Sequence, residues 1–408
     1  MLDFEEIRNL DTPCFVFDEA ELRQNFTDFQ RALHTHWGDA ANVGYSVKTN
    51  PLPWVVRTAL DCGCLAEVVS DDEYALALEC GCDAANVIFN GPVKGAEWIR
   101  FALDSGAVVN LDSQSDLDAV RSYSQAGKLA KVGVRVNIDL EAFCPGETVT
   151  GEAGGRFGWS YENGDLSRVI SLLKSIPNVQ VAGLHMHVTT LSRSQKAYRV
   201  LAEHAARIVR EHELAPAFID IGGGFFGGGP NNVGAYDAYA ETIAAPLREV
   251  VDPATCALYV EPGGAVVCTP GYYVARVRDV KDTPHGRFVV SDFSRINIDH
   301  EMKKTAYNLT FFAKSDNVFD RQVLCGYTCM ESDRLSVLEN APELAVGDML
   351  VINFAGAYSM SFTPGFFIWN PPAVYVKEPS GMRLERPLSR PVPPEPPSST
   401  DNAEEAGL

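Results

Sequence analysis

The sequence lacks long apolar runs and is poor in basic residues. No stretch reaches the roughly 18 uninterrupted apolar residues of a membrane-spanning helix. The opening segment MLDFEEIRNLD is acidic, whereas a signal peptide has a basic segment followed by an apolar one, so we expect a cytoplasmic protein. The 34 Lys and Arg residues are outnumbered by 54 Asp and Glu residues, and the net charge is -20. This balance argues against nucleic acid and anionic membranes as partners, because both bind clustered basic residues.

The usual zinc motifs are also missing, although the chain contains ten cysteines. In each of the pairs Cys62/Cys64 and Cys80/Cys82 a single glycine separates the cysteines, whereas zinc knuckles have a gap of two residues. Each pair follows a predicted helix, where the glycine suits a left-handed C-cap. We therefore expect reduced, mostly buried thiols and no metal site.

Predicted strands and helices alternate from residue 43 onwards. Period-two patterns predict eight strands, at residues 43–48, 65–69, 86–89, 107–111, 131–138, 179–187, 217–221 and 257–261. Helical patterns fall between them, at residues 53–61, 71–80, 95–105, 115–125, 164–175, 194–213 and 236–250. Ser70 and Glu73 form a capping-box signature at the start of one helix. This alternation favours an α/β fold of the (β/α)8 TIM-like barrel type over an open sheet.

The pattern changes after about residue 270. From there, strand-like runs are separated by turn residues, which predicts a C-terminal β-rich domain of barrel or sandwich type. The N-terminal strand can complete this second domain. We therefore expect a barrel at 29–270, a β-domain formed by 1–28 and 271–385, and a disordered tail at 386–408 that is rich in Pro, Ser and acidic residues.

Polar or glycine residues end every predicted barrel strand. A lone strand-end lysine, such as Lys48 in VGYSVKTNP, is usually solvated, but a barrel gathers its strand ends at one mouth. Catalytic groups and phosphate sites of such barrels lie at that mouth. The strand ends carry Lys48, Glu67, Asn90, Asp112, Arg135, His185, His187, Gly222, Gly223, Gly224, and Glu261 followed by Gly263 and Gly264.

These residue types together describe one cofactor. The glycines of DIGGGFFGGG and EPGG leave backbone amides free to bind a phosphate. Glu261 ends an apolar strand and needs a partner, either a protonated ring nitrogen or an arginine such as Arg135. One of the two histidines is expected to pack and the other to stack on a flat ligand. With a desolvated Lys48, whose amine can be neutral and nucleophilic, this set describes pyridoxal phosphate held as a Schiff base.

Two other enzyme classes use similar residues. His185 and His187 form a metal-ligand signature of metal-dependent hydrolases, but those sites begin on the first strand and end with an Asp late in the barrel. A class I aldolase also uses a barrel lysine, although it needs neither the glutamate nor the histidine for a heteroaromatic ring.

The motifs resemble the pyridoxal-phosphate-dependent ornithine/diaminopimelate decarboxylase family, the fold type III group with alanine-racemase-like barrels. YSVKTN is similar to its Y-[AS]-x-K-x-N motif, GLHMHVTT to G-x-H-x-H-x-G-S, and DIGGGF to its glycine motif. EPG, CGYTCMESD, FAGAYSMSF and GRFGW resemble four further segments of the family. The resemblance spans residues 45–370 and implies a barrel that binds pyridoxal 5'-phosphate, a β-domain, and a homodimer with shared active sites.

The resemblance implies roles for individual residues. Lys48 would form the internal aldimine, His187 would stack on the cofactor ring, and Glu261 would pair with the pyridine nitrogen. Cys329 would cross a dimer interface and protonate the carbon left after carbon dioxide departs. The cofactor and its phosphate would also contact Glu67, Arg135, Thr190, Gly222, Gly223, Gly224, Gly263, Gly264 and Tyr358. The substrate would contact Cys329, Met330, Glu331, Asp333 and Tyr358, with Asp333 at its distal end.

Glu261 also favours decarboxylation. A protonated pyridine nitrogen makes the ring a full electron sink, whereas alanine racemases carry an arginine in that role and use a tyrosine as second base. Three positions depart from the family: Gly264 replaces an arginine, Thr190 a serine, and Met330 the acidic residue after the cysteine. We therefore expect a decarboxylase of an amino acid with a polar or charged distal group, diaminopimelate-like or a siderophore or specialised-metabolite intermediate. The alternatives are a racemase of the same fold and a non-catalytic regulatory homologue.

Overall fold

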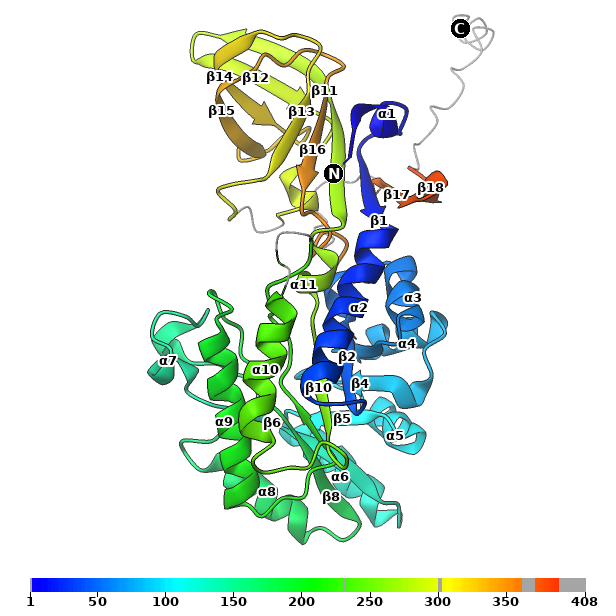
Figure 1. Ribbon diagram of the computed structural model, residues 1–408, viewed down its shortest axis with the longest axis vertical. Helices are drawn as coiled ribbons and strands as arrows, with labels where there is room; N and C mark the ends of the chain where they lie inside the picture. The colour runs from blue at the N-terminus through cyan, green and yellow to red at the C-terminus, as the bar shows by residue number, and fades with distance from the viewer. Residues whose placement is uncertain (1, 230–231, 233, 300–302, 362–370, 389–408) are drawn as a thin grey trace, which may run out of the picture.

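The computed structural model describes residues 2–229, 232, 234–299, 303–361 and 371–388. These residues form two units, a barrel of parallel strands surrounded by helices and a second unit built from strands (Figure 1). The tail predicted at 386–408 lies outside the described residues from residue 389 onwards. None of the helices in the described part of the chain is both long enough and apolar enough to cross a membrane.

The barrel consists of eight parallel strands, which confirms the fold predicted from the alternation. It closes because β10 pairs with β2 and β5 pairs with β6. A two-residue strand, β7 (Trp159–Ser160), pairs with β6 in addition. Around the barrel the strands are β2 (Ala41–Ser46), β3 (Leu65–Val68), β4 (Val87–Phe89), β5 (Val108–Leu111), β6 (Ala130–Asn137), β8 (Val179–His185), β9 (Phe218–Asp220) and β10 (Ala257–Val260).

Helices surround the barrel, and the longer ones bury a face against its strands. Ser70 caps α4 as expected, since its Oγ accepts the Glu73 N–H at 3.1 Å, while the Glu73 carboxylate accepts the N–H of Val69 at 2.9 Å. The helices are α2 (Glu19–His36), α3 (Pro53–Asp61), α4 (Asp71–Glu79), α5 (Ala96–Ser105), α6 (Gln114–Gln125), α7 (Leu140–Phe143), α8 (Asp165–Ser175), α9 (Gln195–Glu211), α10 (Ala235–Leu247) and α11 (Gly264–Val267).

The paired cysteines follow two of these helices. Gly63 and Gly81 have φ angles of +82° and +95°, so each takes the left-handed conformation predicted after α3 and α4. All ten cysteines are free thiols, and most of them are buried. Burial raises the pKa of Cys82 to about 11, which keeps this thiol protonated at neutral pH.

The N-terminal strand belongs to the second unit. β1 (Cys14–Asp18) lies between β11 (Gly271–Thr283), to which it is antiparallel, and β17 (Ala373–Glu378), to which it is parallel. The helix α2 follows β1 directly and runs unbroken through the domain limit predicted between residues 28 and 29, while the limits themselves stay a prediction. The unit also contains α1 (Phe4–Ile7), β12 (Gly286–Ser291), β13 (Leu309–Phe312), β14 (Val318–Cys325), β15 (Arg334–Pro342), β16 (Met349–Asn353) and β18 (Gly381–Arg386).

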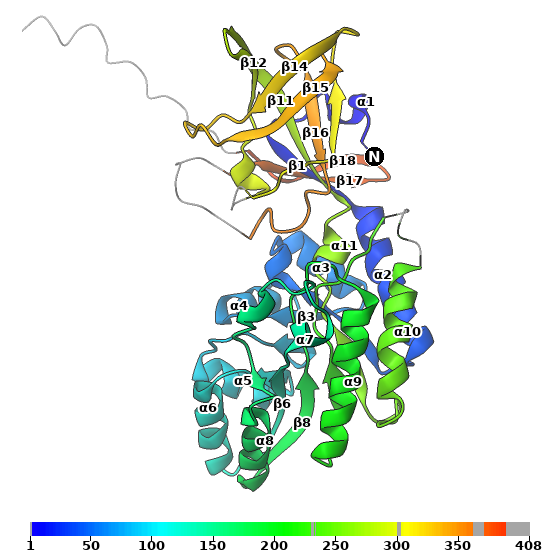
Figure 2. The same cartoon turned by 90° about the vertical axis from the view of Figure 1, so that its left-hand side faces the viewer.

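The segment after β16 returns to the barrel and contacts its mouth (Figure 2). The Tyr358 N–H donates to the Thr49 carbonyl at 2.8 Å, and Asn50 Nδ2 donates to the Gly356 carbonyl at 2.9 Å. Ser361 Oγ donates to the same Thr49 carbonyl at 3.1 Å. The mouth of the barrel is therefore built by residues of both units.

Candidate active site

Lys48 lies at the centre of the barrel mouth, in a short 3-10 turn (Val47–Thr49) after β2 and not within the strand as predicted. Its Nζ atom lies 2.7 Å from Ser46 Oγ and 2.7 Å from Glu67 Oε2. Burial lowers the pKa of Lys48, but the carboxylates of Glu67 and Glu261 outweigh burial and raise the pKa above its ordinary value. The side chain is therefore an ammonium group, where the sequence led us to expect a neutral amine.

A network of amides joins Glu67 to Glu261 across the barrel. Asn90 Nδ2 donates to Glu67 Oε1 at 3.1 Å and to Glu261 Oε1 at 2.5 Å. Asn110 Nδ2 in turn donates to Asn90 Oδ1 at 2.9 Å. All four side chains are buried, so these bonds take the place of contacts with solvent, while Asn110 Oδ1 has no hydrogen-bond partner among the described residues. The network fixes the positions of both carboxylates relative to Lys48.

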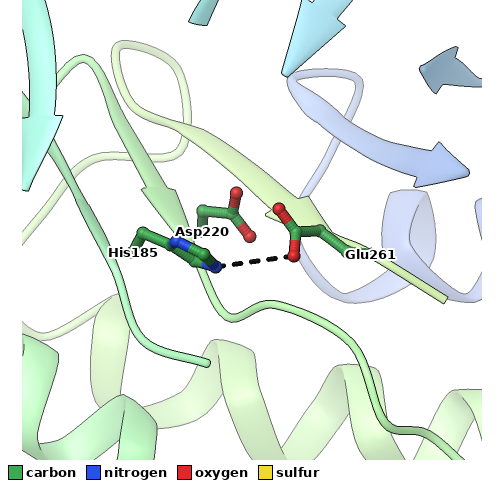
Figure 3. A group of neighbouring side chains, drawn as sticks. All are labelled: His185, Asp220 and Glu261. Atoms are coloured by element: carbon green, nitrogen blue, oxygen red, sulfur yellow. Dashed lines mark ion pairs between the residues drawn. The ribbon is translucent and has the colours of Figure 1, made fainter. Parts of the chain in front are cut away.

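His185, Asp220 and Glu261 form a buried cluster beneath the mouth (Figure 3). His185 Nε2 lies 3.5 Å from Glu261 Oε2, and one ligand atom of each residue lies within 4.8 Å of the other two. Burial raises the pKa of Glu261, but His185, Asp220 and Lys48 outweigh burial and hold the pKa below its ordinary range. Glu261 is therefore an ionised carboxylate inside the barrel.

Arg135 does not pair with Glu261, which was one of the two partners that the sequence left open. Its Nη1 atom lies 2.9 Å from Asp112 Oδ2, and both side chains are buried. Its guanidinium also lies over the Phe157 ring, 4.6 Å from the centroid. The second oxygen of Asp112 accepts the Gly158 N–H at 2.6 Å. The charge of Arg135 is thus neutralised within the barrel wall, and Glu261 keeps room for another cation.

His187 presents a neutral, flat ring at the mouth. It lies two residues beyond the end of β8, and its ring is parallel to that of His185 to within 13°, at a centroid distance of 6.4 Å. Nδ1 accepts the Gly223 N–H at 3.2 Å, which fixes the ring plane. Burial, followed by the charge of Arg135, lowers the pKa of His187 to about 3. The ring is therefore uncharged at neutral pH and suited to stacking.

Two glycine clusters meet beside His187 and leave no space for side chains. A Cβ on Gly222 would lie 2.4 Å from the Cβ of His187, and one on Gly223 would lie 2.3 Å from the Glu261 carbonyl. A Cβ on Gly263 would lie 2.0 Å from Thr49 Oγ1, a buried hydroxyl with no hydrogen-bond partner in the described part of the chain. The N–H groups of Gly222 and Gly223 are already bonded to Asp220 and His187, so the clusters offer close backbone approach and one hydroxyl left to be satisfied.

The comparison with known proteins identifies this arrangement. Residues 19–268 match the family described as "Pyridoxal-dependent decarboxylase, pyridoxal binding domain". The chain belongs to the pyridoxal-dependent decarboxylase family. It is accordingly an amino-acid carboxy-lyase that depends on pyridoxal 5'-phosphate, and the family resemblance seen in its motifs is confirmed.

Relatives of this pyridoxal-dependent decarboxylase align over most of its length. The probable chloroplastic diaminopimelate decarboxylase of Oryza sativa subsp. japonica is 29% identical and covers 90% of this chain and 75% of its own. The diaminopimelate decarboxylase of Bacteroides thetaiotaomicron is 27% identical, with coverages of 89% and 94%. The crystal structure of the M. jannaschii diaminopimelate decarboxylase shares the fold, with a TM-score of 0.83 at 22% identity over 95% of this chain and 92% of that one.

The residues at the mouth of the decarboxylase fit pyridoxal phosphate. The cofactor requires an amine, a phosphate cradle, a stacking surface and a partner for its ring nitrogen. Lys48, the glycine clusters with the unsatisfied Thr49 hydroxyl, the neutral His187 ring and the ionised Glu261 offer these four features. The predicted residues Lys48, Glu67, His187 and Glu261 are thus brought together at one mouth.

Other predicted residues serve local structure in this conformation. Thr190 Oγ1 accepts the Arg193 N–H at 3.1 Å, and Tyr358 is about half exposed (46%) with a φ of +58°. Asp333 is buried and accepts hydrogen bonds from the Ser294 hydroxyl at 3.0 Å and the Arg295 N–H at 2.9 Å. Its role at the distal end of the substrate stays a prediction.

The loop between β14 and β15 carries the predicted proton donor. Cys329 is exposed on this loop, and Met330 is half buried. Glu331 is exposed and pairs with Arg334 at 2.7 Å. Thr328 Oγ1 donates to Asp333 Oδ2 at 2.6 Å, so the loop is held from within the second unit. The substrate contacts assigned to this loop stay predictions.

Sequence reasoning missed four residues that complete the site. Ser46 and Thr49 flank the lysine within YSVKTN, and Asp220 opens DIGGGF, so each lies inside a motif that was already noted. Their contacts depend on neighbouring strands, which a single motif does not show. Asn110 had a weaker signal, since it is a polar residue within the apolar strand β5.

Proposed function

We propose that this chain decarboxylates an amino acid with a polar or charged distal group, and that diaminopimelate is the first substrate to test. The observation that carries the proposal is the ionised Glu261 in the barrel interior. A carboxylate in that place favours a protonated ring nitrogen, and a protonated ring withdraws electrons most strongly. This property suits loss of carbon dioxide and argues against the racemase alternative. The relatives described as diaminopimelate decarboxylases support diaminopimelate in particular.

Each residue of the mouth then has a proposed task. Lys48 would hold the cofactor covalently, after its proton has passed to a neighbour such as Glu67, 2.7 Å away. His187 would stack on the ring, and Glu261 would hold the proton of the ring nitrogen. The phosphate would lie beside the two glycine clusters, with Thr190, Arg135 and Tyr358 around the cofactor; the clusters are Gly222, Gly223 and Gly224, and Gly263 and Gly264. When bound, pyridoxal phosphate supplies the electron sink for the bond that breaks.

Cys329 is the proposed proton donor for the product, and it requires a second subunit. Its thiol is exposed on the β14–β15 loop of the second unit, whereas Lys48 lies at the barrel mouth. A homodimer in which this loop enters the partner's mouth would place the thiol beside the substrate carbon. We therefore propose a homodimer with shared active sites.

A cavity beside the mouth gives the substrate room for a charged end. It measures about 540 Å³ and borders Arg135 and His187. Groups of both signs line it, including Arg156, Glu152 and Glu162. A distal group that carries both an ammonium and a carboxylate, as in diaminopimelate, suits such a mixed lining better than a single amine.

Release of carbon dioxide tests the proposal. The protein, purified with pyridoxal phosphate, is supplied in turn with diaminopimelate, lysine, ornithine, arginine and citryl conjugates of amino acids. We expect carbon dioxide and the matching amine from diaminopimelate or a close analogue, and none with Lys48→Ala. If the cofactor is bound, as judged by borohydride trapping, yet no amino acid releases carbon dioxide, the non-catalytic homologue becomes the better reading. Loss of optical activity without carbon dioxide would instead indicate a racemase.

A further inference from the structure

Asp220 is a buried carboxyl group without a cation of its own. It lies at the end of β9 and is fully buried. Oδ1 accepts the Gly222 N–H at 2.8 Å, and Oδ2 lies 3.4 Å from Asn110 Nδ2. Within the described part of the chain, no ion pair involves this residue, although an isolated buried carboxylate is very costly.

A second carboxyl group is a close ionisable neighbour of Asp220. One carboxylate oxygen of Asp220, one of Glu261 and one ring nitrogen of His185 all lie within 4.8 Å of one another (Figure 3). Two buried carboxylates at such a distance do not both ionise, so the pair holds one proton. Glu261 is the ionised member of the pair, because its carboxylate lies 3.5 Å from His185 Nε2 and accepts a hydrogen bond from the Asn90 amide at 2.5 Å.

We propose that Asp220 is a neutral carboxylic acid that donates its proton in a hydrogen bond to Glu261 and so keeps Glu261 ionised beneath the cofactor ring. Asp220 is then a positioning residue that acts through Glu261. The proposal rests on the proposed function only in the identity of the ring above Glu261. The carboxylic acid itself is a property of the cofactor-free protein.

The surrounding charges agree with this assignment. Burial, followed by the charge of Glu261, raises the pKa of Asp220 far above its ordinary range. The other ionisable groups that face the pair are His185 from β8, Glu67 from β3, Tyr259 from β10 and Lys48 above Glu261. Glu67 adds negative charge near Asp220, which also favours the protonated acid.

The chemistry predicts which substitution the site tolerates. In Asp220→Asn, the amide oxygen can still accept the Gly222 N–H, and the amide nitrogen can donate to Glu261 in place of the acid proton. Asp220→Leu fills the volume but donates nothing, so the pKa of Glu261 should rise. As the pH is lowered, we therefore expect the Asn variant to lose cofactor binding at the same pH as the wild type. The Leu variant should lose binding at a higher pH than the wild type.

Infrared spectroscopy of the cofactor-free protein gives the decisive measurement. A protonated carboxylic acid has a C=O stretching band that carboxylates lack. At neutral pH we expect one such band in the wild type, its loss in Asp220→Asn, and its retention in Asp104→Asn. Asp104 is the matched control, because it is an exposed carboxylate that pairs with Lys128 at 2.7 Å. The infrared experiment stands even if Asp220→Leu does not fold.

Two results would overturn the proposal. One is an infrared spectrum of Asp220→Asn that is identical to that of the wild type. The other is a stoichiometric metal ion in the purified protein that is absent from His185→Ala, because metal ligands must be deprotonated and the cluster could then be a metal site. Neither result concerns carbon dioxide release, so a failure of the proposed function and a failure of this proposal are distinguishable.

Discussion

The ammonium of Lys48 and the carboxylate of Glu67 lie 2.7 Å apart at the barrel mouth, where the Glu67 side chain is buried and the Lys48 side chain is partly exposed. This distance decides the charge of the lysine. Burial alone would lower the pKa of Lys48, and the opposing carboxylates reverse the direction. Lys48 is therefore held in its protonated form, and a carboxylate lies within reach of its proton.

Glu67→Gln should shift cofactor capture to lower pH. Without its nearest carboxylate, Lys48 is subject to burial with less opposition, so its pKa falls and a neutral amine is available at lower pH. The measurement is the amount of pyridoxal phosphate that borohydride fixes to the cofactor-free protein across a pH series. Glu79→Gln, on the exposed face of α4, is the matched control. An unchanged midpoint would show that Glu67 does not control the lysine.

His187 should make the cofactor-free protein sensitive to acid. Its pKa is about 3 in the folded protein, against an ordinary value of 6.5. Between these values the unfolded chain binds more protons than the folded one, so the free energy of unfolding decreases as pH falls. His187→Phe removes this dependence, and chemical denaturation over this pH range should give a shallower slope than for the wild type. His285→Phe, on the exposed β11–β12 turn, should keep the wild-type slope.

Two adjacent glycines should respond in opposite ways to side chains. Gly263→Ala places a Cβ against Thr49 Oγ1, and overpacking of this kind costs about 1–3 kcal/mol. Gly264 faces open space, since the nearest atom to its Cβ position is Ala357 Cβ at 3.9 Å. Gly264→Arg can therefore offer a cation to the phosphate, worth about 1.5–3 kcal/mol. We expect Gly263→Ala to weaken binding of pyridoxal phosphate and Gly264→Arg to strengthen it.

Binding of pyridoxal, which has no phosphate, tests whether Gly264→Arg acts through the phosphate charge or through the stability of the protein. Pyridoxal has the same ring and aldehyde but no phosphate, so Gly264→Arg should leave its dissociation constant close to the wild-type value. Binding is followed through the absorption of the cofactor on addition to the cofactor-free protein. An equal gain for pyridoxal and pyridoxal phosphate would place the phosphate away from Gly264.

The sequence predicted the barrel and its mouth because those features repeat. Eight strands with polar ends produce a pattern long enough to be read without a structure, and the glycines after β9 and β10 mark close backbone approach. The protonation and the pairing of the side chains at the mouth follow no such repeating pattern. The ammonium of Lys48 depends on Glu67, a residue from the next strand, and the pairing of Arg135 with Asp112 depends on strands β5 and β6 lying side by side.

The second unit was harder to predict in its details. Cys329 and Asp333 were selected for their motif, yet one side chain is exposed and the other accepts bonds from Ser294 and Arg295. A motif gives the order of residues along the chain and not the direction of each side chain. The exposed position of Cys329 fits its proposed role only if the loop meets a second subunit.

Mixed dimers test whether two chains share one active site. Lys48→Ala removes the residue that would hold the cofactor, and Cys329→Ala removes the proposed proton donor, whose loss typically costs about 10²–10⁴-fold in rate. If each mouth takes Cys329 from the partner, a dimer of one Lys48→Ala and one Cys329→Ala subunit contains one intact site and one doubly altered site. Random mixing should then restore about one quarter of the wild-type activity, although each variant alone is nearly inactive.

The control mixes Lys48→Ala subunits with subunits that carry both Lys48→Ala and Cys329→Ala, so that no intact site can form. If the first mixture stays as inactive as this control, while gel filtration shows that the subunits exchange, Cys329 acts within its own chain or not at all.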